Sequence, residues 1–97
     1  GGPAMILSVK HTVADVDAWK TAFEDHAVAR KEHGATGHRL AQSLDDPNAL
    51  TVLIMFPERS AADGFLADPS LKEAMANAGV TNAPVFEFLD VTEEAAY

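Results

Sequence analysis

The segment Leu50–Phe56 limits what this chain can fold into more than any other part of it. Six of its seven residues are apolar, and the seventh, Thr51, is small. A strand with one face in water alternates apolar and polar side chains, because successive side chains point to opposite faces of a sheet. Since Leu50–Phe56 does not alternate, we expect a strand that is buried on both faces. Helices can cover one face, and a second copy of the same sheet is the simplest cover for the other.

Length and charge narrow the class of protein. The chain of 97 residues predicts one domain. Its formal net charge is −8, from 15 acidic and 7 basic residues. This excess argues against nucleic acid and against an anionic membrane as partners, because both bind clustered Lys and Arg. No apolar run approaches the ~20 residues of a membrane span. The absence of Cys excludes disulfides and thiolate metal sites, and it is compatible with the cytoplasmic location that we expect.

Three segments are expected along the chain. Residues 1–4, Gly-Gly-Pro-Ala, resemble a cloning remnant ahead of a natural start at Met5. Residues 5–92 are expected to form the domain, and residues 93–97 a mobile tail.

Apolar runs and the turns between them predict four strands. These are residues 5–10, 38–44, 50–56 and 85–91. The polar sequence Asp45-Asp46-Pro47-Asn48 separates the middle two, so these strands are expected to form a hairpin. In the second strand His38 shares a face with Leu40 and Leu44, and a His in line with leucines is expected to be partly buried.

The first helical region precedes this hairpin. From Val16 to His33, apolar, aromatic and basic residues recur every three or four positions and mark one helical face. Asp15 or Asp17 can cap the start of this helix, and Gly34 can end it.

The second helical region follows the hairpin. Ser60 and Asp63 have the spacing of a capping box before a helix that runs to about residue 67. Asp68-Pro69 interrupts the region and can cap a second segment, which Gly79 ends. The resulting order is β-α-β-β-α-β. This is the α+β, ferredoxin-like arrangement of an antiparallel sheet with two helices on one face.

The composition of the strands also predicts an assembly. An uncovered sheet face of this kind would expose several hundred Å² of apolar surface, which soluble monomers rarely do. At ~25 cal/mol per Å², burying it is favourable by several kcal/mol per subunit before the cost of association is subtracted. We therefore expect a two-fold homodimer.

The chain resembles the dimeric α/β barrel superfamily, which includes antibiotic-biosynthesis monooxygenases, some polyketide cyclases and stress-responsive barrel proteins. The resemblance covers Met5–Val91. It rests on the strand Met5–Val9, the helix opening Val16–Trp19 with Phe23, Gly34, the turn Asp45–Asn48 before an apolar strand, and the run Phe65–Leu71 with Met75, Gly79-Val80 and Pro84.

The resemblance implies a fold and a function. Two sheets would close into a barrel across the homodimer, with a small-molecule cavity between the sheet and the helices of each subunit. The protein would be a cofactor-independent monooxygenase or cyclase that acts on an aromatic or polyketide-like substrate. Monooxygenase members place an Asn, a Trp and a His, or a Tyr and an Arg, in that cavity. Here the first strand has no Asn, and the single Tyr is Tyr97 in the tail. The alternative is a non-catalytic ligand-binding or structural interaction module of the same fold.

Histidines are the candidates for catalysis, because imidazole titrates near neutral pH. On the helical face, His26 could act as a general base toward an acidic C–H or a phenolic proton. Arg30 could then stabilise the developing enolate or phenolate. His38 is the second candidate and could line the cavity or hydrogen-bond across the dimer. In the alternative orientation of the helix, His26 and Arg30 lie at the solvent edge.

The ligand pocket is expected to be lined by residues from the first strand and both helical regions: His11, Trp19, Phe23, Arg30 and Phe65. His11 ends the first strand near the mouth of the pocket in this fold. For the Trp and the two Phe residues, plain packing between helix and sheet is the alternative. His33 is expected to neutralise the negative end of its helix.

No metal ion is expected. His26 and His33 lie seven positions apart, which is ~10 Å along a helix. Two ligands of one ion lie only ~3–4 Å apart. A site formed by His11, His38 and a carboxylate, or a haem held by one His in an open cavity, is the minority alternative.

Overall fold

The computed structural model describes residues 5–97, so the expected cloning remnant lies outside the described residues. The elements follow in the order β1 (Met5–Thr12), α1 (Val16–Asp25), α2 (Ala27–Glu32), β2 (Gly37–Gln42), β3 (Ala49–Phe56), α3 (Arg59–Ala67), α4 (Pro69–Asn77) and β4 (Val85–Asp90). The predicted order β-α-β-β-α-β is confirmed, with each helical region divided in two. Within the described residues, no helix is long and apolar enough to cross a membrane.

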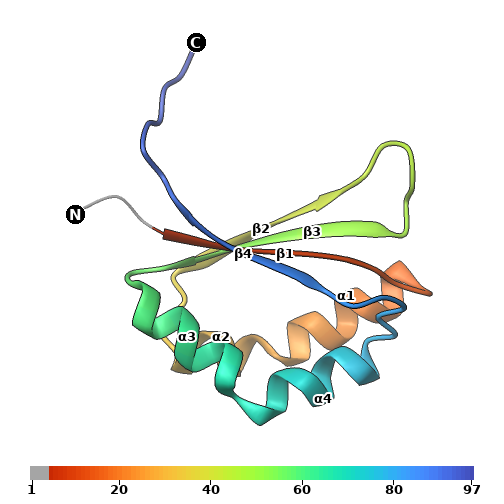
Figure 1. Cartoon of the computed structure of the whole chain (residues 1–97). Coiled ribbons are helices and arrows are strands. Elements are labelled where there is room, and N and C mark those ends of the chain that lie inside the picture. Colours follow the sequence, from red (N-terminus) through yellow and green to blue (C-terminus); the bar gives the residue numbers. More distant parts are fainter. Residues whose placement is uncertain (1–4) are drawn as a thin grey trace.

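The four strands form one antiparallel sheet in the order β2-β3-β1-β4. The apolar strands β1 and β3 are therefore central, and Leu7 of β1 lies between Ile54 of β3 and Phe88 of β4. All four helices lie on one face of the sheet (Figure 1). This is the expected ferredoxin-like fold.

The core lies between the sheet and the helices. Every second residue of β3 is buried there, from Leu50 to Phe56. Trp19 of α1 and Phe65 of α3 are the buried aromatic residues of the helical layer, and the rings of Phe56 and Phe65 lie 5.8 Å apart. Burying each such side chain contributes ~2 kcal/mol to folding.

The opposite face of the sheet carries no helix. Its apolar residues Ile6, Leu53 and Met55 are half-buried, and Leu89 is exposed. We expected strand β3 to be buried on both faces. Within a single chain, helices cover only one of them.

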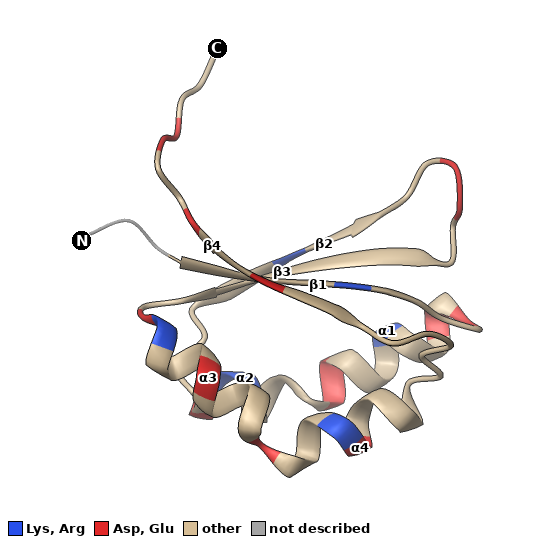
Figure 2. Ribbon diagram, viewed as in Figure 1, with Lys and Arg blue, Asp and Glu red and all other residues tan. Residues whose placement is uncertain are grey.

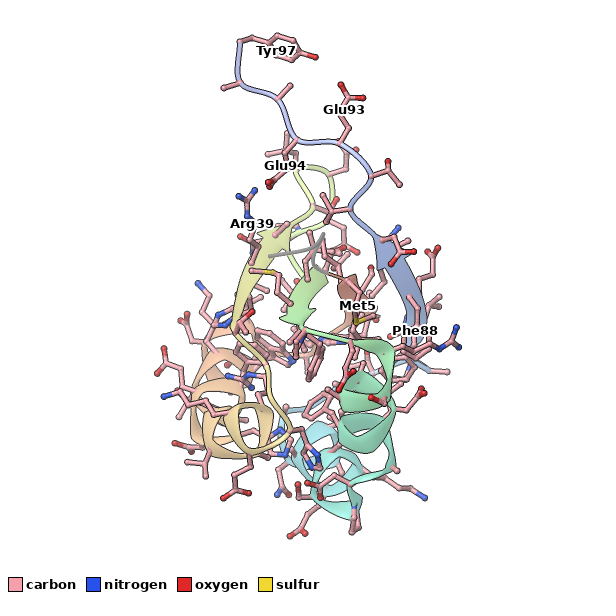
Figure 3. All side chains as sticks on the ribbon, turned by 90° about the vertical axis from the view of Figure 1, so that its left-hand side faces the viewer. Met5, Arg39, Phe88, Glu93, Glu94 and Tyr97 are labelled. Atoms are coloured by element: carbon pink, nitrogen blue, oxygen red, sulfur yellow. The ribbon has the colours of Figure 1, made fainter. Side chains whose placement is uncertain are left out.

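Two segments project from the sheet on the helix-free side. The loop between β2 and β3 bends to that side (Figure 1), and the tail that carries Glu93, Glu94 and Tyr97 points the same way (Figure 3). Residues 91–97 contain no helix or strand, and Tyr97 is fully exposed. The mobility of this tail stays a prediction.

The first helical region is broken at His26. The sequence predicts one helix from Val16 to His33, but α1 ends at Asp25 and α2 begins at Ala27. His26 between them has φ −87° and ψ 3°. No Gly or Pro marks the break, so the pattern of apolar residues could not show it.

Two of the three predicted helix caps are confirmed. The carboxylate of Asp15 accepts a hydrogen bond from the Ala18 N–H at 3.1 Å, and that of Asp68 accepts one from the Ser70 N–H at 2.9 Å. The predicted capping box at Ser60 is wrong. The helix begins two residues earlier than this box predicts, at Arg59, with Glu58 at the cap position and no side-chain cap bond.

The second strand is shorter than predicted. It ends at Gln42, because the Ser43 hydroxyl accepts hydrogen bonds from the N–H groups of Asp45 and Asp46 and so starts the turn early. Leu44, expected on the strand, lies in this turn and is fully exposed.

Candidate functional site

A cavity of about 50 Å³ lies between the sheet and the helices. One water molecule needs ~10–15 Å³ of such space, so the cavity would hold a few waters. Its wall is mostly apolar. Six of the seven residues expected at the site contribute to it, namely His11, Trp19, Phe23, His26, Arg30 and Phe65. The seventh, His38, does not.

His11 is the most unusual residue of this wall. It lies on β1, and only 5 % of its surface is exposed. Neither ring nitrogen has a hydrogen-bond partner among residues 5–97. Leaving a buried donor or acceptor unpaired costs ~1–3 kcal/mol. Burial lowers the pKa of His11 below its usual value, which favours the neutral ring, and a neutral imidazole offers one donor and one acceptor.

A row of aromatic rings leads from His11 to the molecular surface. The ring of Trp19 lies 5.4 Å from that of His11, and Phe23 stacks on Trp19 at 4.8 Å with 16° between the planes. His38 meets Phe23 edge-on at 4.9 Å. The row therefore connects the buried end of β1 with the sheet edge.

His38 is exposed, so the expectation that it is partly buried among leucines is wrong. The reason is its strand, since β2 lies at the edge of the sheet. Partial desolvation, together with the nearby charge of Arg30, lowers the pKa of His38.

Arg30 is buried, with 6 % of its surface exposed, so it does not lie at the solvent edge. Its Nη1 donates a hydrogen bond to the carbonyl oxygen of Phe23 at 2.8 Å, and its Cζ lies 3.6 Å from the centre of the Phe23 ring. The ion pairs within residues 5–97 join His33 to Asp68 and Arg59 to Asp63. No carboxylate in this part of the chain therefore pairs with Arg30. Burial lowers the pKa of Arg30, but a guanidinium stays protonated in a protein.

Two polar contacts tie the first helical region to the start of α4. His26 Nε2 hydrogen-bonds to the Ser70 hydroxyl at 2.9 Å, and His33 Nε2 lies 2.8 Å from Asp68 Oδ2. The Ser70 N–H and His33 lower the pKa of Asp68 to about 2. Burial, followed by the charge of Arg30, lowers the pKa of the half-buried His26. His33 thus pairs with the carboxylate that caps α4, where the sequence predicted only a role at its own helix end.

An open groove of about 550 Å³ lies beyond Phe23, where β2 faces α1 and α2. Phe23 and Arg30 line both the groove and the cavity, so they stand between the two spaces. Lys20, Lys31 and His38 also line the groove.

The site shows no arrangement suited to a metal. Among residues 5–97, no three or more His, Asp or Glu side chains gather where they could hold an ion. The cavity beside His11 has room for a few waters and is far too small for a haem. The neutral imidazole of His11 offers one hydrogen-bond donor and one acceptor at this wall, next to the rings of Trp19 and Phe23.

The sequence identified the polar and aromatic residues that the helices and β1 bring to this wall but missed two partners of its histidines. Asp68 was assigned only to helix capping and Ser70 to no role, yet these two residues hold His33 and His26. These contacts span 44 and 35 positions, and no local pattern signals them.

Comparison with known proteins supports the fold. No family model matches the sequence, and no curated protein sequence matches it. A putative antibiotic biosynthesis monooxygenase from Caulobacter crescentus is similar in structure with a TM-score of 0.74 and 23% identity, over 94% of this chain and 92% of that one. A variant of SnoaB, a cofactor-independent oxygenase from Streptomyces nogalater, has a TM-score of 0.76 and 16% identity, over 96% and 97% of the two chains.

A third similar structure is Rv0793 from Mycobacterium tuberculosis. Its TM-score is 0.68 at 19% identity, over 98% of this chain and 100% of that one. At these identities the likeness shows the fold alone. This chain has the ferredoxin-like fold seen in antibiotic biosynthesis monooxygenase-like proteins, as its sequence predicted.

Proposed function

We propose that this protein binds a small aromatic molecule in the cavity beside His11 and acts on it as a cofactor-independent monooxygenase. The observation that carries this proposal is the unpaired imidazole of His11 in an otherwise apolar wall. Binding sites for small molecules are typically apolar, with a few polar groups that fix the orientation of the ligand. A phenolic hydroxyl would supply the hydrogen bond that His11 lacks.

His11 would serve as the general base of this reaction. A neutral imidazole can accept a phenolic proton. A carbon of the resulting phenolate would then be oxidised by molecular oxygen: a C–O bond forms, the O–O bond breaks, one oxygen atom stays on the ring as a quinone carbonyl and the other leaves as water. Trp19 would pack against the substrate ring. His26 is the second candidate for the base, but one of its ring nitrogens is already held by Ser70.

The cavity is partly open to the surface, and displacement of Phe23 would enlarge it. A cavity of about 50 Å³ is small beside the ~300–1,000 Å³ of common ligand pockets. Phe23 separates it from the larger groove, so rotation of this one side chain would join the two spaces. Helix α4, which closes another side of the cavity, contributes no buried residue and could shift as well.

The proposed working unit is a two-fold homodimer whose sheets pack through the helix-free face. The half-buried Leu53 and Met55 at the centre of this face support it, as does the exposed Leu89. Acidic residues lie in the β2–β3 loop, in the tail and on β4, an edge strand whose Glu87 shares this face with Leu53 (Figure 2). Carboxylates at the rim with apolar residues at the centre are the usual pattern of an interface.

The alternative is a non-catalytic module that binds a ligand through the same cavity. The small size of the cavity favours this alternative, since it leaves little room for a substrate and oxygen together. We propose a cytoplasmic location for either function, in keeping with the absence of Cys.

The test is an assay with a neutral phenolic probe. Trp19 is the single Trp of the chain, so the shift of its indole N–H in an NMR spectrum reports on the cavity directly. We expect 2-naphthol to shift this signal in a saturable way, and an anthrone to be oxidised with consumption of oxygen. His11→Leu should abolish both effects. Saturable binding without oxygen consumption would leave the non-catalytic alternative, and an unchanged indole signal would contradict both.

A further inference from the structure

We propose that the groove between β2 and the helices α1 and α2 binds an anionic group of the ligand, a carboxylate in the first instance, with Arg30 as its principal contact. This inference rests on the proposed function in one respect, because the apolar part of the same ligand would occupy the cavity.

Arg30 provides the main argument. A buried charge is costly unless it is paired. Within residues 5–97, Arg30 has one hydrogen bond, to the Phe23 carbonyl, and one aromatic ring beneath it. These contacts use one of its five N–H donors, and they supply no negative charge. An anion bound at the guanidinium would supply both the missing charge and further acceptors.

The surroundings of Arg30 are also positive. Lys20, Arg30 and Lys31 line the groove and are three of only seven Lys and Arg residues in a chain of net charge −8. Glu24 is the single carboxylate on the groove wall, and it forms no ion pair within residues 5–97. Cationic side chains in a concave site raise the local concentration of anions.

The position of the groove indicates what the anion would be attached to. Phe23 and Arg30 line both spaces, so a ligand anchored at Arg30 reaches the cavity by passing the Phe23 ring. The planar fork of a guanidinium matches a carboxylate through two parallel hydrogen bonds. The geometry therefore favours a flat aromatic acid, with its ring toward Trp19 and its carboxylate toward Arg30. A sulfonate or phosphate shares this chemistry and is distinguished by the experiment.

Calorimetric titration with matched probes tests the proposal. We expect 2-naphthoate to bind at least ~10-fold tighter than 2-naphthol at low salt, which corresponds to ~1.4 kcal/mol. The preference should shrink at high salt, because exposed charges are screened. It should also shrink in Arg30→Gln and in the double variant Lys20→Gln/Lys31→Gln. The matched control is Lys72→Gln, an exposed Lys on α4 outside the groove, which should keep the full preference.

The double variant protects the test from a folding defect, because Lys20 and Lys31 are exposed while Arg30 is buried. Parallel titrations with 2-naphthalenesulfonate and 2-naphthyl phosphate show which oxyanion fits best, and tighter binding of either one than of 2-naphthoate would overturn the choice of carboxylate.

The failures of the two proposals are distinguishable. Equal affinity for the acid and the phenol, or a preference that survives in both groove variants, would overturn the anion site while binding in the cavity stands. Binding of 2-naphthoate that depends on Arg30, without any binding of 2-naphthol, would support the anion site and contradict the proposed phenolic substrate. Binding of neither probe would overturn both.

Discussion

The Arg30 guanidinium covers the ring of Phe23 at 3.6 Å and bonds to the carbonyl oxygen of the same residue at 2.8 Å. Arg30 therefore holds both the side chain and the backbone of the residue that separates the cavity from the groove. Because Phe23 also stacks on Trp19, a movement of its ring would change the surroundings of the proposed site at once. The first prediction follows from this relationship.

Phe23→Ala should open the cavity to the groove. Phe23 is half-buried, so removing its ring should cost part of the ~3–5 kcal/mol of a fully buried Phe, and urea should unfold this variant at a lower concentration. The barrier to ligand entry should fall with the ring, and 2-naphthol should bind faster in stopped-flow measurements. Val28→Ala, at an exposed position of α2, is the control and should change neither quantity. An unchanged association rate would show that Phe23 does not control entry.

His11→Leu should stabilise the protein while it removes function. An unpaired buried polar group is replaced by an apolar one, so the free energy of unfolding at pH 7 should rise by ~1 kcal/mol. Residues kept for function often lower stability in this way. His38→Leu is the matched control, since His38 is exposed and its replacement should change stability by less than ~0.5 kcal/mol. A destabilised His11→Leu variant would mean that the ring has a structural partner after all.

Stability should fall as the pH drops below neutrality, and His11 should account for part of the fall. Burial lowers the pKa of His11 in the folded state below the reference value of 6.5. Between the two pKa values the unfolded chain binds the proton and the folded chain does not, so acid favours unfolding. The contribution of neutral His11 to the free energy of unfolding is therefore fully present above pH 6.5. It is lost as the pH falls toward the lowered pKa of the folded state. The pKa values of His26 and His38 are lowered as well and act in the same direction.

Urea unfolding between pH 7.5 and 4.5 measures this effect. The free energy of unfolding should fall less steeply with decreasing pH in His11→Leu than in the wild type. Asp68 acts in a separate window. Its pKa falls from 3.8 to about 2 on folding, so its contribution is present above pH 3.8 and is lost as the pH falls toward 2. Asp68→Asn should remove the second fall, and it should deepen the first slightly, because the charge of Asp68 raises the pKa of His26. If the free energy of unfolding depends on pH equally in the wild type and in His11→Leu above pH 4.5, then His11 does not cause the fall.

Leu53→Glu should separate the proposed dimer. Leu53 lies on the central strand β3, on the face without helices, with Arg39 of β2 as its cross-strand neighbour. A carboxylate at position 53 would lose water in the dimer, and one neighbouring Arg would offset only part of that cost. Light scattering after gel filtration should show the wild type at twice the mass of the variant. Val28→Glu introduces the same charge at an exposed helical position and should stay dimeric. A wild-type protein that runs as one chain would contradict the homodimer.

The fold could be predicted from local features of the sequence. Strand β3 is identified by its uninterrupted apolar run, and α4 by Asp68 and Pro69 at its start. Such signals act within a few residues, so they are readable without knowledge of distant contacts. The break at His26 could not be read, because no helix-breaking residue marks it.

The candidate site was only partly predictable. The helical spacing placed Trp19, Phe23 and Arg30 on one face, and the structure brings all three to the cavity or its edge. The strand pattern suggested that His38 is buried, but the order of strands puts it at an edge. The sequence by itself determined the order of strands and helical regions along the chain and the inward face of the first helical region, because turn residues and helical periodicity are local properties. Only the tertiary structure decided that His11 has no partner and that Arg30 has no counter-ion within residues 5–97, because both depend on residues that come from distant parts of the chain.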